Sequence, residues 1–126
     1  MALTSEDKVE IAELAARYNR AIDSGDAEGW AATFTEDGVF EGSQGKVQGR
    51  EALVHFVEDR EQRATSQQRH WNNNFVIEGD GDSATLTCYL LLMSGSEVAA
   101  IGSYDDVLRR VDGAWRFAHR TVTIER

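Results

Sequence analysis

The feature that most constrains the fold is a change in hydrophobic period near His70. Before this point, apolar side chains recur every three or four residues, which is the spacing of one helix face. After it, apolar and polar residues alternate, which is typical of strands. Helices followed by a run of strands predict an α+β fold with a mainly antiparallel sheet. A chain of 126 residues is one domain in size, so we expect residues 1–126 to form a single unit.

The first half predicts three helices. Thr4 is suited to cap the first helix, and Gly25 can take the left-handed conformation that ends it. Asp26 is placed to cap a second, short helix. The elements expected in this half are helices at residues 5–22, 26–34 and 50–62, a short strand at 39–41 and a glycine-rich loop or loose hairpin at 42–49.

The second half predicts a meander of four long strands, at residues 70–78, 83–93, 98–111 and 114–124. Gly102 interrupts the third of these strands and indicates a β-bulge. Regular alternation in the last strand places His119 on the same face as Trp115 and Phe117.

These strands carry apolar residues on both faces. In residues 83–93, Leu86 and Leu90 point one way, whereas Tyr89 and Leu91 point the other. Three helices can cover only one face of such a sheet, and a half-solvated sheet would alternate with polar residues. We therefore expect the outer face to pack against a second copy of the chain, giving a homodimer.

Charge and composition exclude several classes of protein. The formal net charge is −9, from 13 basic and 22 acidic residues. Without a basic cluster, such a chain is not expected to bind nucleic acid or an anionic membrane, and no apolar run approaches the length of a membrane helix. The N-terminal residues are polar and there is one cysteine, so we expect a cytoplasmic protein without an internal disulfide. The three histidines lack metal-ligand spacing, so no metal site is expected.

Two titratable residues are the best candidates for chemistry. His70 opens the first long strand, and Asp23 follows the last inward residue of the first helix. A helix C-terminus disfavours an anion, so this carboxylate requires a cation or a hydrogen-bond donor. An imidazole would serve, and the carboxylate would fix its tautomer and increase its basicity. From the residues alone, however, an ordinary helix-terminal Asp remains an open alternative, and His119 is as compatible with a core position as with a pocket wall.

The chain resembles the SnoaL-like branch of the NTF2-like superfamily over almost its whole length. The resemblance rests on the order and spacing of several short phrases, none of which is specific by itself. They are YNRAIDSGD at residues 18–26, FTEDGVF at 34–40, GREAL at 49–53, Arg69-His70 with Asn74, GDSA at 81–84 and DGAWRFAHR at 112–120. The resemblance implies a cone in which a curved sheet wraps around three N-terminal helices and encloses a central apolar pocket. It also implies a dimer through the outer sheet face.

Within that superfamily, scytalone dehydratase and hexachlorocyclohexane dehydrochlorinase have an Asp-His pair to which Asp23 and His70 are similar. The resemblance therefore implies an enzyme, a lyase or isomerase without metal or cofactor, in which His70 is the general base and Asp23 orients it. Tyr18 stands where the dehydrochlorinase has a lysine, which favours dehydration over dehydrohalogenation. The implied ligand is a small apolar, aromatic or alicyclic molecule. The expected substrate-binding residues are Tyr18, Trp30, Phe34, Phe56, Tyr89, Tyr104 and His119.

Two other functions are compatible with the same fold, because a fold does not determine an activity. One is a non-catalytic module that binds a small molecule or another protein. The other is an accessory subunit of a ring-hydroxylating oxygenase. The distance between the Asp23 carboxylate and the His70 imidazole is the observation that best separates the enzyme from these alternatives.

Overall fold

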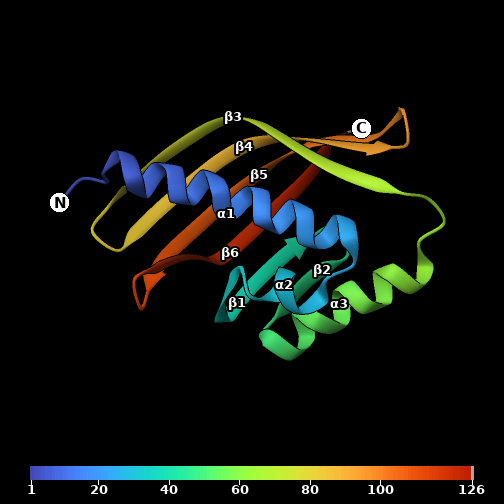
Figure 1. The fold of residues 1–126 in the computed structure, drawn as a ribbon, viewed down its shortest axis with the longest axis horizontal. Coiled ribbons are helices and arrows are strands. Elements are labelled where there is room, and N and C mark those ends of the chain that lie inside the picture. The colour runs from blue at the N-terminus through green and yellow to red at the C-terminus, as the bar shows by residue number, and fades with distance from the viewer. Residues whose placement is uncertain (126) are drawn as a thin grey trace.

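The computed structural model of the chain describes residues 1–125 and shows the expected α+β architecture (Figure 1). The helices are α1 (Ser5–Ser24), α2 (Ala27–Ala31) and α3 (Arg50–Arg63). The strands are β1 (Phe34–Gly42), β2 (Gly45–Gln48), β3 (Gln68–Asp80), β4 (Ser83–Ser94), β5 (Glu97–Val111) and β6 (Ala114–Glu125). The glycine-rich segment thus forms a hairpin with β1 through β2, which is one of the two forms expected for it.

Helix α1 begins and ends where its sequence indicates. Thr4 and Asp7 form a capping box, in which each side chain accepts a hydrogen bond from the other residue's backbone N–H. At the other end Gly25 adopts φ 75°, and its N–H reaches the carbonyl groups of the last turn. Because both ends are fixed, the C-terminal turn of α1 has a defined position over the sheet.

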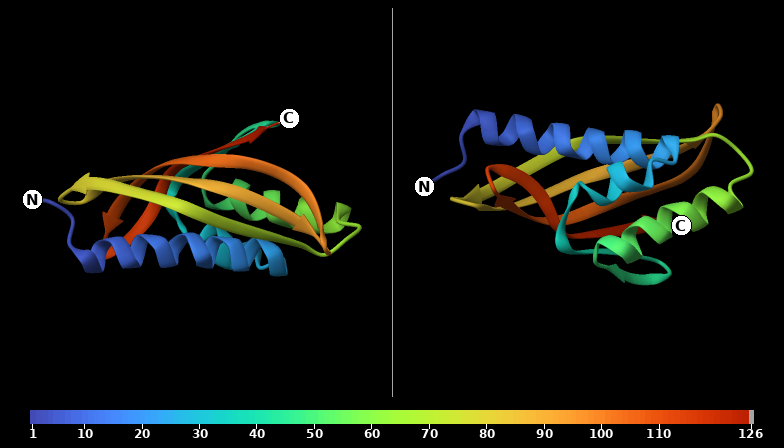
Figure 2. Two further views of the ribbon diagram at one scale, coloured as in Figure 1. Left: turned by 90° about the horizontal axis from the view of Figure 1, so that it is seen from above. Right: turned by 60° about the horizontal axis from the view of Figure 1, so that its bottom comes forward.

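The six strands form one open sheet in the order β2-β1-β6-β5-β4-β3. All neighbouring pairs are antiparallel except β1 and β6, which are parallel. The sheet is curved, and the helices lie on its concave side (Figure 2). We call this helix-covered side the inner face and the opposite side the outer face.

Three bulges change which side chains reach each face. β3 has one extra residue between Asn73 and Val76, where Asn74 has φ 57°. β5 has one at Ala99, and β6 has one at Ala118. The expected bulge at Gly102 was wrong: this residue pairs regularly with Leu90 and Ile124. Its side chain is absent because a Cβ there would lie 2.2 Å from the Thr123 carbonyl oxygen.

The bulge at Ala118 reverses the alternation of β6. Trp115 and Phe117 are buried on the inner face, as expected, but the following inward residue is Arg120. His119 consequently points away from the core, so the expectation that it shares a face with Trp115 was wrong. The bulge in β3 acts in the same way, because Phe75 packs against the core on the same face as His70.

The inner face and the helices enclose one core. Apart from Arg120, its largest buried side chains are aromatic and come from α1, α2, β1, β5 and β6. The outer face differs, because several large apolar side chains are exposed on it. Trp71 and Tyr89 are 60% and 59% exposed, and Val76, Val98, Ile101, Val107 and Val111 are also exposed. Among residues 1–125, no helix has the length and apolar character needed to cross a membrane.

Candidate active site

The structure brings Asp23 and His70 together although 47 residues separate them in the chain. Asp23 lies in the last turn of α1, and His70 is the third residue of β3. The imidazole Nδ1 lies 2.6 Å from Asp23 Oδ1, and the backbone N–H of His70 donates to both carboxylate oxygens at 3.1 Å. The Asp23 carboxylate therefore receives the hydrogen-bond donors that its position at a helix C-terminus requires.

This contact determines which imidazole nitrogen is free for chemistry. A carboxylate only accepts hydrogen bonds, so Nδ1 carries the hydrogen that it shares with Asp23. In the neutral ring, Nε2 is then the unprotonated nitrogen and can accept a proton. The side chains of His70 and Asp23 are only 10% and 17% exposed, so the contact is shielded from competing water.

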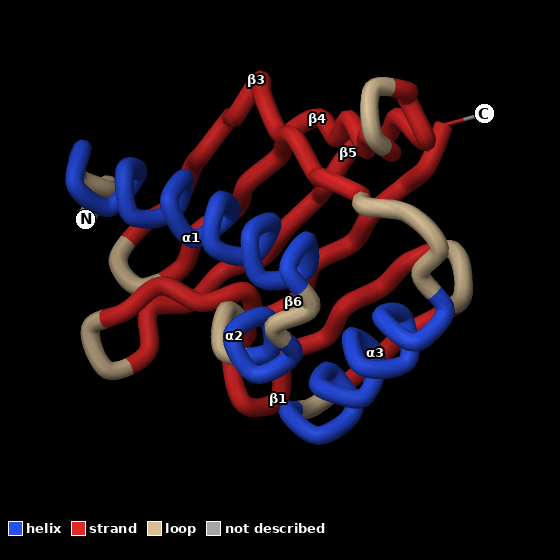
Figure 3. The backbone as a smooth tube through the Cα atoms, turned by 45° about the vertical axis from the view of Figure 1, so that its right-hand side comes forward, coloured by secondary structure: helices blue, strands red, loops and turns tan. Residues whose placement is uncertain are grey.

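Neighbouring contacts between α1 and β3 hold Asp23 and His70 in position relative to each other. The end of α1 and the segment leading into β3 run side by side (Figure 3). Gln67, the residue before β3, donates from its side chain to the Asp23 carbonyl at 3.3 Å. Further along, Asn19 of α1 donates to Asn72 of β3 at 2.8 Å. The Asp23–His70 pair therefore lies in the contact between α1 and β3, which we call the seam. Hydrogen bonds hold the seam together on both sides of the pair.

A groove of about 630 Å³ reaches this seam. Asp23, His70 and Asn19 line it together with Arg20, Glu61 and Arg69, so its walls are mainly polar. Gln67 and Trp71 also line it. The Asp23–His70 pair thus opens toward polar surroundings, in contrast to the apolar lining expected from the sequence.

Five of the seven expected substrate-binding residues gather in the aromatic core. Tyr18 contacts Trp30, Phe34 and Tyr104 with ring centroids 5.4, 6.1 and 5.9 Å apart. Phe56 stacks on Trp30 at 5.5 Å and is the half-buried member of the group. These rings pack on one another and form the apolar centre of the molecule.

The other two expected substrate-binding residues lie elsewhere. Tyr89 belongs to the outer face, because strand alternation in β4 opposes it to the buried Cys88 and Leu90. His119 Nε2 lies 3.0 Å from Glu41 Oε1, and both side chains are about one-third exposed. Neither residue lines the aromatic core, because each lies on the outer face of its strand.

The core also contains an ion pair that the sequence did not indicate. Asp106 of β5 and Arg120 of β6 are directly opposite in the sheet, and both side chains are fully buried. Arg120 Nε lies 3.1 Å from Asp106 Oδ1, but the groups are poorly aligned, and neither atom makes a well-directed hydrogen bond within residues 1–125. The guanidinium stacks on the ring of Tyr104 at 3.6 Å and of Tyr18 at 4.3 Å. Predicting this ion pair from the sequence would have required knowing that β6 bulges at Ala118. An alanine at that position gives no indication of a bulge.

Burial alters the protonation of this cluster. Desolvation raises the pKa of the Asp106 carboxyl to about 7, although the charge of Arg120 opposes this change. Desolvation also raises the pKa of the Tyr18 and Tyr104 hydroxyl groups. Both tyrosines therefore stay protonated and can act as hydrogen-bond donors at neutral pH.

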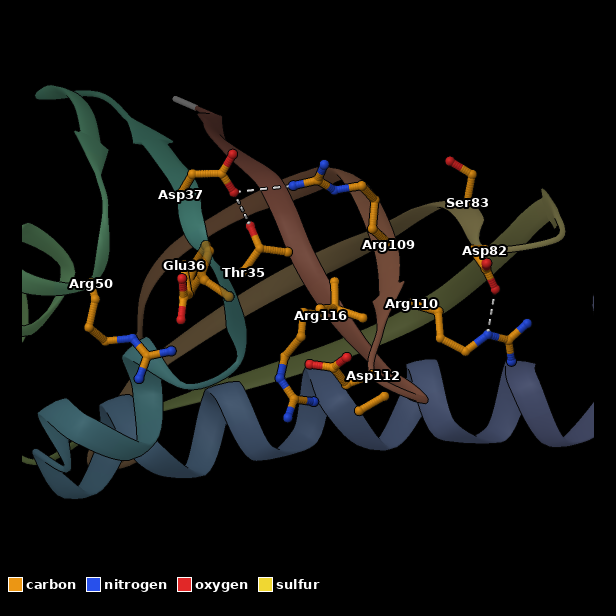
Figure 4. A pocket seen from close by; sticks show the side chains of 13 residues that line it. Thr35, Glu36, Asp37, Arg50, Asp82, Ser83, Arg109, Arg110, Asp112 and Arg116 are labelled. Atoms are coloured by element: carbon orange, nitrogen blue, oxygen red, sulfur yellow. Dashed lines mark hydrogen bonds and ion pairs between the residues drawn. The ribbon is translucent and has the colours of Figure 1, made fainter.

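A second, larger groove of about 840 Å³ lies away from Asp23 and His70 (Figure 4). Four of its charged side chains form two ion pairs: Asp37 accepts from Thr35 and Arg109, and Arg110 donates to Asp82. Because these charges are paired, we assign no chemistry to this groove. No group of three or more potential metal ligands occurs within residues 1–125.

The fold and the position of the Asp-His pair define a class: small α+β proteins with an open, curved sheet on one side of their helices. The model of the SnoaL-like domain matches residues 3–121, and the chain belongs to this family. No curated protein matches the chain significantly.

Solved structures support the same assignment. A protein of unknown function with a cystatin-like fold from Nostoc punctiforme is 32% identical, with a TM-score of 0.93, over 99% of this chain and 96% of that chain. Rv3472 from Mycobacterium tuberculosis, also of unknown function, is 33% identical with a TM-score of 0.89, over 95% and 72% of the two chains. ActVI-ORFA from Streptomyces coelicolor is 28% identical with a TM-score of 0.80, over 94% and 97%.

Proposed function

We propose that the protein is an enzyme, a lyase or isomerase that transfers a proton in a small molecule without a cofactor. The observation that carries the proposal is the 2.6 Å contact between Asp23 Oδ1 and His70 Nδ1. A shielded imidazole with one nitrogen held by a carboxylate and the other free is the arrangement of a general base. The SnoaL-like family, of small-molecule-binding proteins on this fold, is compatible with such a role.

In the elimination that we favour, His70 Nε2 removes a proton from a substrate carbon. The electrons of the C–H bond form a C=C bond as the C–O bond to a neighbouring hydroxyl breaks. The imidazolium then returns its proton to the departing oxygen, which leaves as water. Asp23 stabilises the imidazolium between these steps through Nδ1. In an isomerisation, the same proton would return to a different carbon.

The implied substrate is a small molecule with an apolar, flat or alicyclic body. This choice comes from the resemblance to scytalone dehydratase and not from the groove, because Tyr18 and its aromatic neighbours pack on one another in the core. The polar groove at His70 favours a substrate whose reacting end is polar.

Proton transfer can be tested before the natural substrate is known. A panel of cyclic β-hydroxy ketones incubated in D₂O would be followed by NMR for deuterium incorporation and for loss of water. We expect His70→Ala to lower the rate by about 10²–10⁴-fold. His55→Ala is the matched control, because His55 is exposed on α3 and, within residues 1–125, pairs only with Glu58.

Thermal melting of both variants would show that the loss is not caused by unfolding. If His70→Ala retained the rate of the unmodified protein on a substrate that is turned over, the general-base role would be refuted. Binding of the panel without exchange or elimination in the unmodified protein would instead support the non-catalytic module.

We also propose that the outer face forms a homodimer. The support is the set of exposed apolar side chains on β3, β4 and β5, among them Trp71, Tyr89 and Ile101. These residues surround a shallow groove of about 610 Å³. A patch of this kind on a monomer would expose a large apolar area to water, which a second copy would cover.

A further inference from the structure

Asn19 has a buried hydrogen-bond acceptor beside the Asp23–His70 pair that nothing in the described chain occupies. Asn19 is 8% exposed, and its Oδ1 receives no hydrogen bond from any residue within 1–125. A buried acceptor without a donor costs about 1–3 kcal/mol. An acceptor left in this state next to a candidate active site is therefore a candidate for binding a donor on the ligand.

The hydrogen-bond network fixes which end of the Asn19 amide is free. The Asn72 side-chain NH₂ donates to the carbonyl oxygens of Trp71 and Tyr89, at 3.2 and 3.1 Å. Asn72 Oδ1 must therefore be the acceptor, and Asn19 Nδ2 donates to it at 2.8 Å. Exchanging the nitrogen and oxygen of the Asn72 amide would place two donors opposite each other, and exchanging those of Asn19 would place two acceptors opposite each other. The unoccupied atom of Asn19 is consequently its oxygen.

The position of Asn19 on α1 places its side chain beside the Asp23–His70 pair. Asn19 lies four residues before Asp23 on α1, so the two side chains share one face of the helix. Asn72 lies two residues after His70 on β3, on the same strand face. The two contacts across the seam are thus neighbours, and Asn19 lines the same groove as Asp23 and His70.

We infer that Asn19 Oδ1 is a specificity-determining acceptor that binds a hydroxyl group of the substrate. This inference rests on the proposed function for its chemical meaning and names the substrate class: a small hydroxylated molecule. An amide oxygen stabilises a hydroxyl that keeps its hydrogen and opposes the departure of that oxygen as a leaving group. The hydroxyl bound by Asn19 is therefore retained in the product, and the leaving group is a different one.

Phenol and anisole form a matched probe pair, because anisole replaces the O–H donor by a methyl ether. Binding would be measured by ¹H–¹⁵N NMR titration, following the Asn19 side-chain NH₂ and the His70 backbone N–H. We expect the unmodified protein to bind phenol at least about fivefold more tightly than anisole, which corresponds to one net hydrogen bond. Asn19→Leu removes the acceptor at similar size and should abolish the preference. Asn73→Leu, on the exposed outer face, is the control and should retain it.

Asn19→Asp provides a second variant, because it keeps an acceptor oxygen while removing the amide donor to Asn72. Asn19→Asp should still bind phenol more tightly than anisole. If Asn19→Leu does not fold, the preference of Asn19→Asp is the test of the inference. The inference is overturned if Asn19→Leu keeps the preference, if Asn19→Asp loses it, or if phenol does not shift the Asn19 signal. Phenol offers neither an abstractable carbon proton nor a leaving group. His70→Ala should therefore retain the phenol preference, and a failure of catalysis would not affect this result.

Discussion

The buried carboxyl of Asp106 makes a specific prediction about how stability depends on pH. Burial raises its pKa in the folded protein to about 7 from an ordinary value of 3.8. The folded state therefore binds a proton more tightly than the unfolded state does. Stability from this group is fully present below about pH 4 and is lost as pH rises toward about 7.

The size of the effect follows from the displacement of the pKa. Each pKa unit corresponds to about 1.36 kcal/mol, so the change from 3.8 to about 7 corresponds to at most about 4 kcal/mol. Asp7 acts in a different window, because hydrogen bonds led by the Thr4 backbone N–H lower its pKa to about 2. Its contribution is complete above about pH 4 and is lost only as pH falls toward 2, so the two effects are separable.

The test compares Asp106→Asn with the unmodified protein by urea unfolding at several pH values between about 4 and about 8. The amide does not titrate, so the difference in free energy of unfolding between the two proteins should change by up to about 4 kcal/mol across this range. The unmodified protein should lose its relative advantage as pH rises. Asp105→Asn is the control, because Asp105 is the exposed neighbour on the same strand.

The reasoning would be refuted if Asp106→Asn and the unmodified protein showed parallel pH profiles. A difference that grew in the opposite direction, with the unmodified protein gaining stability as pH rises, would refute it too. In that case Arg120 would hold the carboxylate ionised, and the buried pair would be a stable ion pair at neutral pH.

Three further predictions concern the fold. Thr4→Ala should lower the free energy of unfolding by about 1 kcal/mol in urea titrations, because it removes half of the capping box of α1. Gly102→Ala should lower it by about 1–3 kcal/mol, because the added Cβ would meet the Thr123 carbonyl oxygen. A double change of Trp71 and Tyr89 to Asp should give a folded monomer by size-exclusion chromatography with light scattering. An unmodified protein that is already monomeric at micromolar concentration would contradict the proposed dimer.

The general architecture was predictable from the sequence because it depends on period. The 3.6-residue pattern of α1 and the alternation of β4 each survive in the structure without interruption. End signals were equally reliable, as Thr4 and Gly25 show. The expected α+β class and the SnoaL-like family follow from these features together with the order of the short phrases along the chain.

The side-chain composition of the inner face was less predictable, because alternation fails wherever a strand gains a residue. Ala118 shows the effect most clearly: one extra residue moves His119 outward and Arg120 into the core. Asn74 has a similar role in β3, and only its tolerance of positive φ hints at a bulge. A prediction of the inward-facing residues of β6 from strict alternation therefore included His119 and omitted Arg120.

Bulge placement also explains why one candidate site was recognisable and the other was not. Asp23 and His70 lie at element ends, before any bulge in β3, so their placement depends on where α1 stops and β3 starts. Asp106 and Arg120 face each other only because the extra residue at Ala118 brings Arg120 to the inner face. If Ala118 were instead a regular, paired residue of β6, strict alternation would turn His119 toward the core and Arg120 toward the outer face. The bulge thus exchanges a titratable imidazole for a permanent cation at the centre of the molecule, where the guanidinium stacks on the neighbouring aromatic rings and opposes the neutralisation of Asp106.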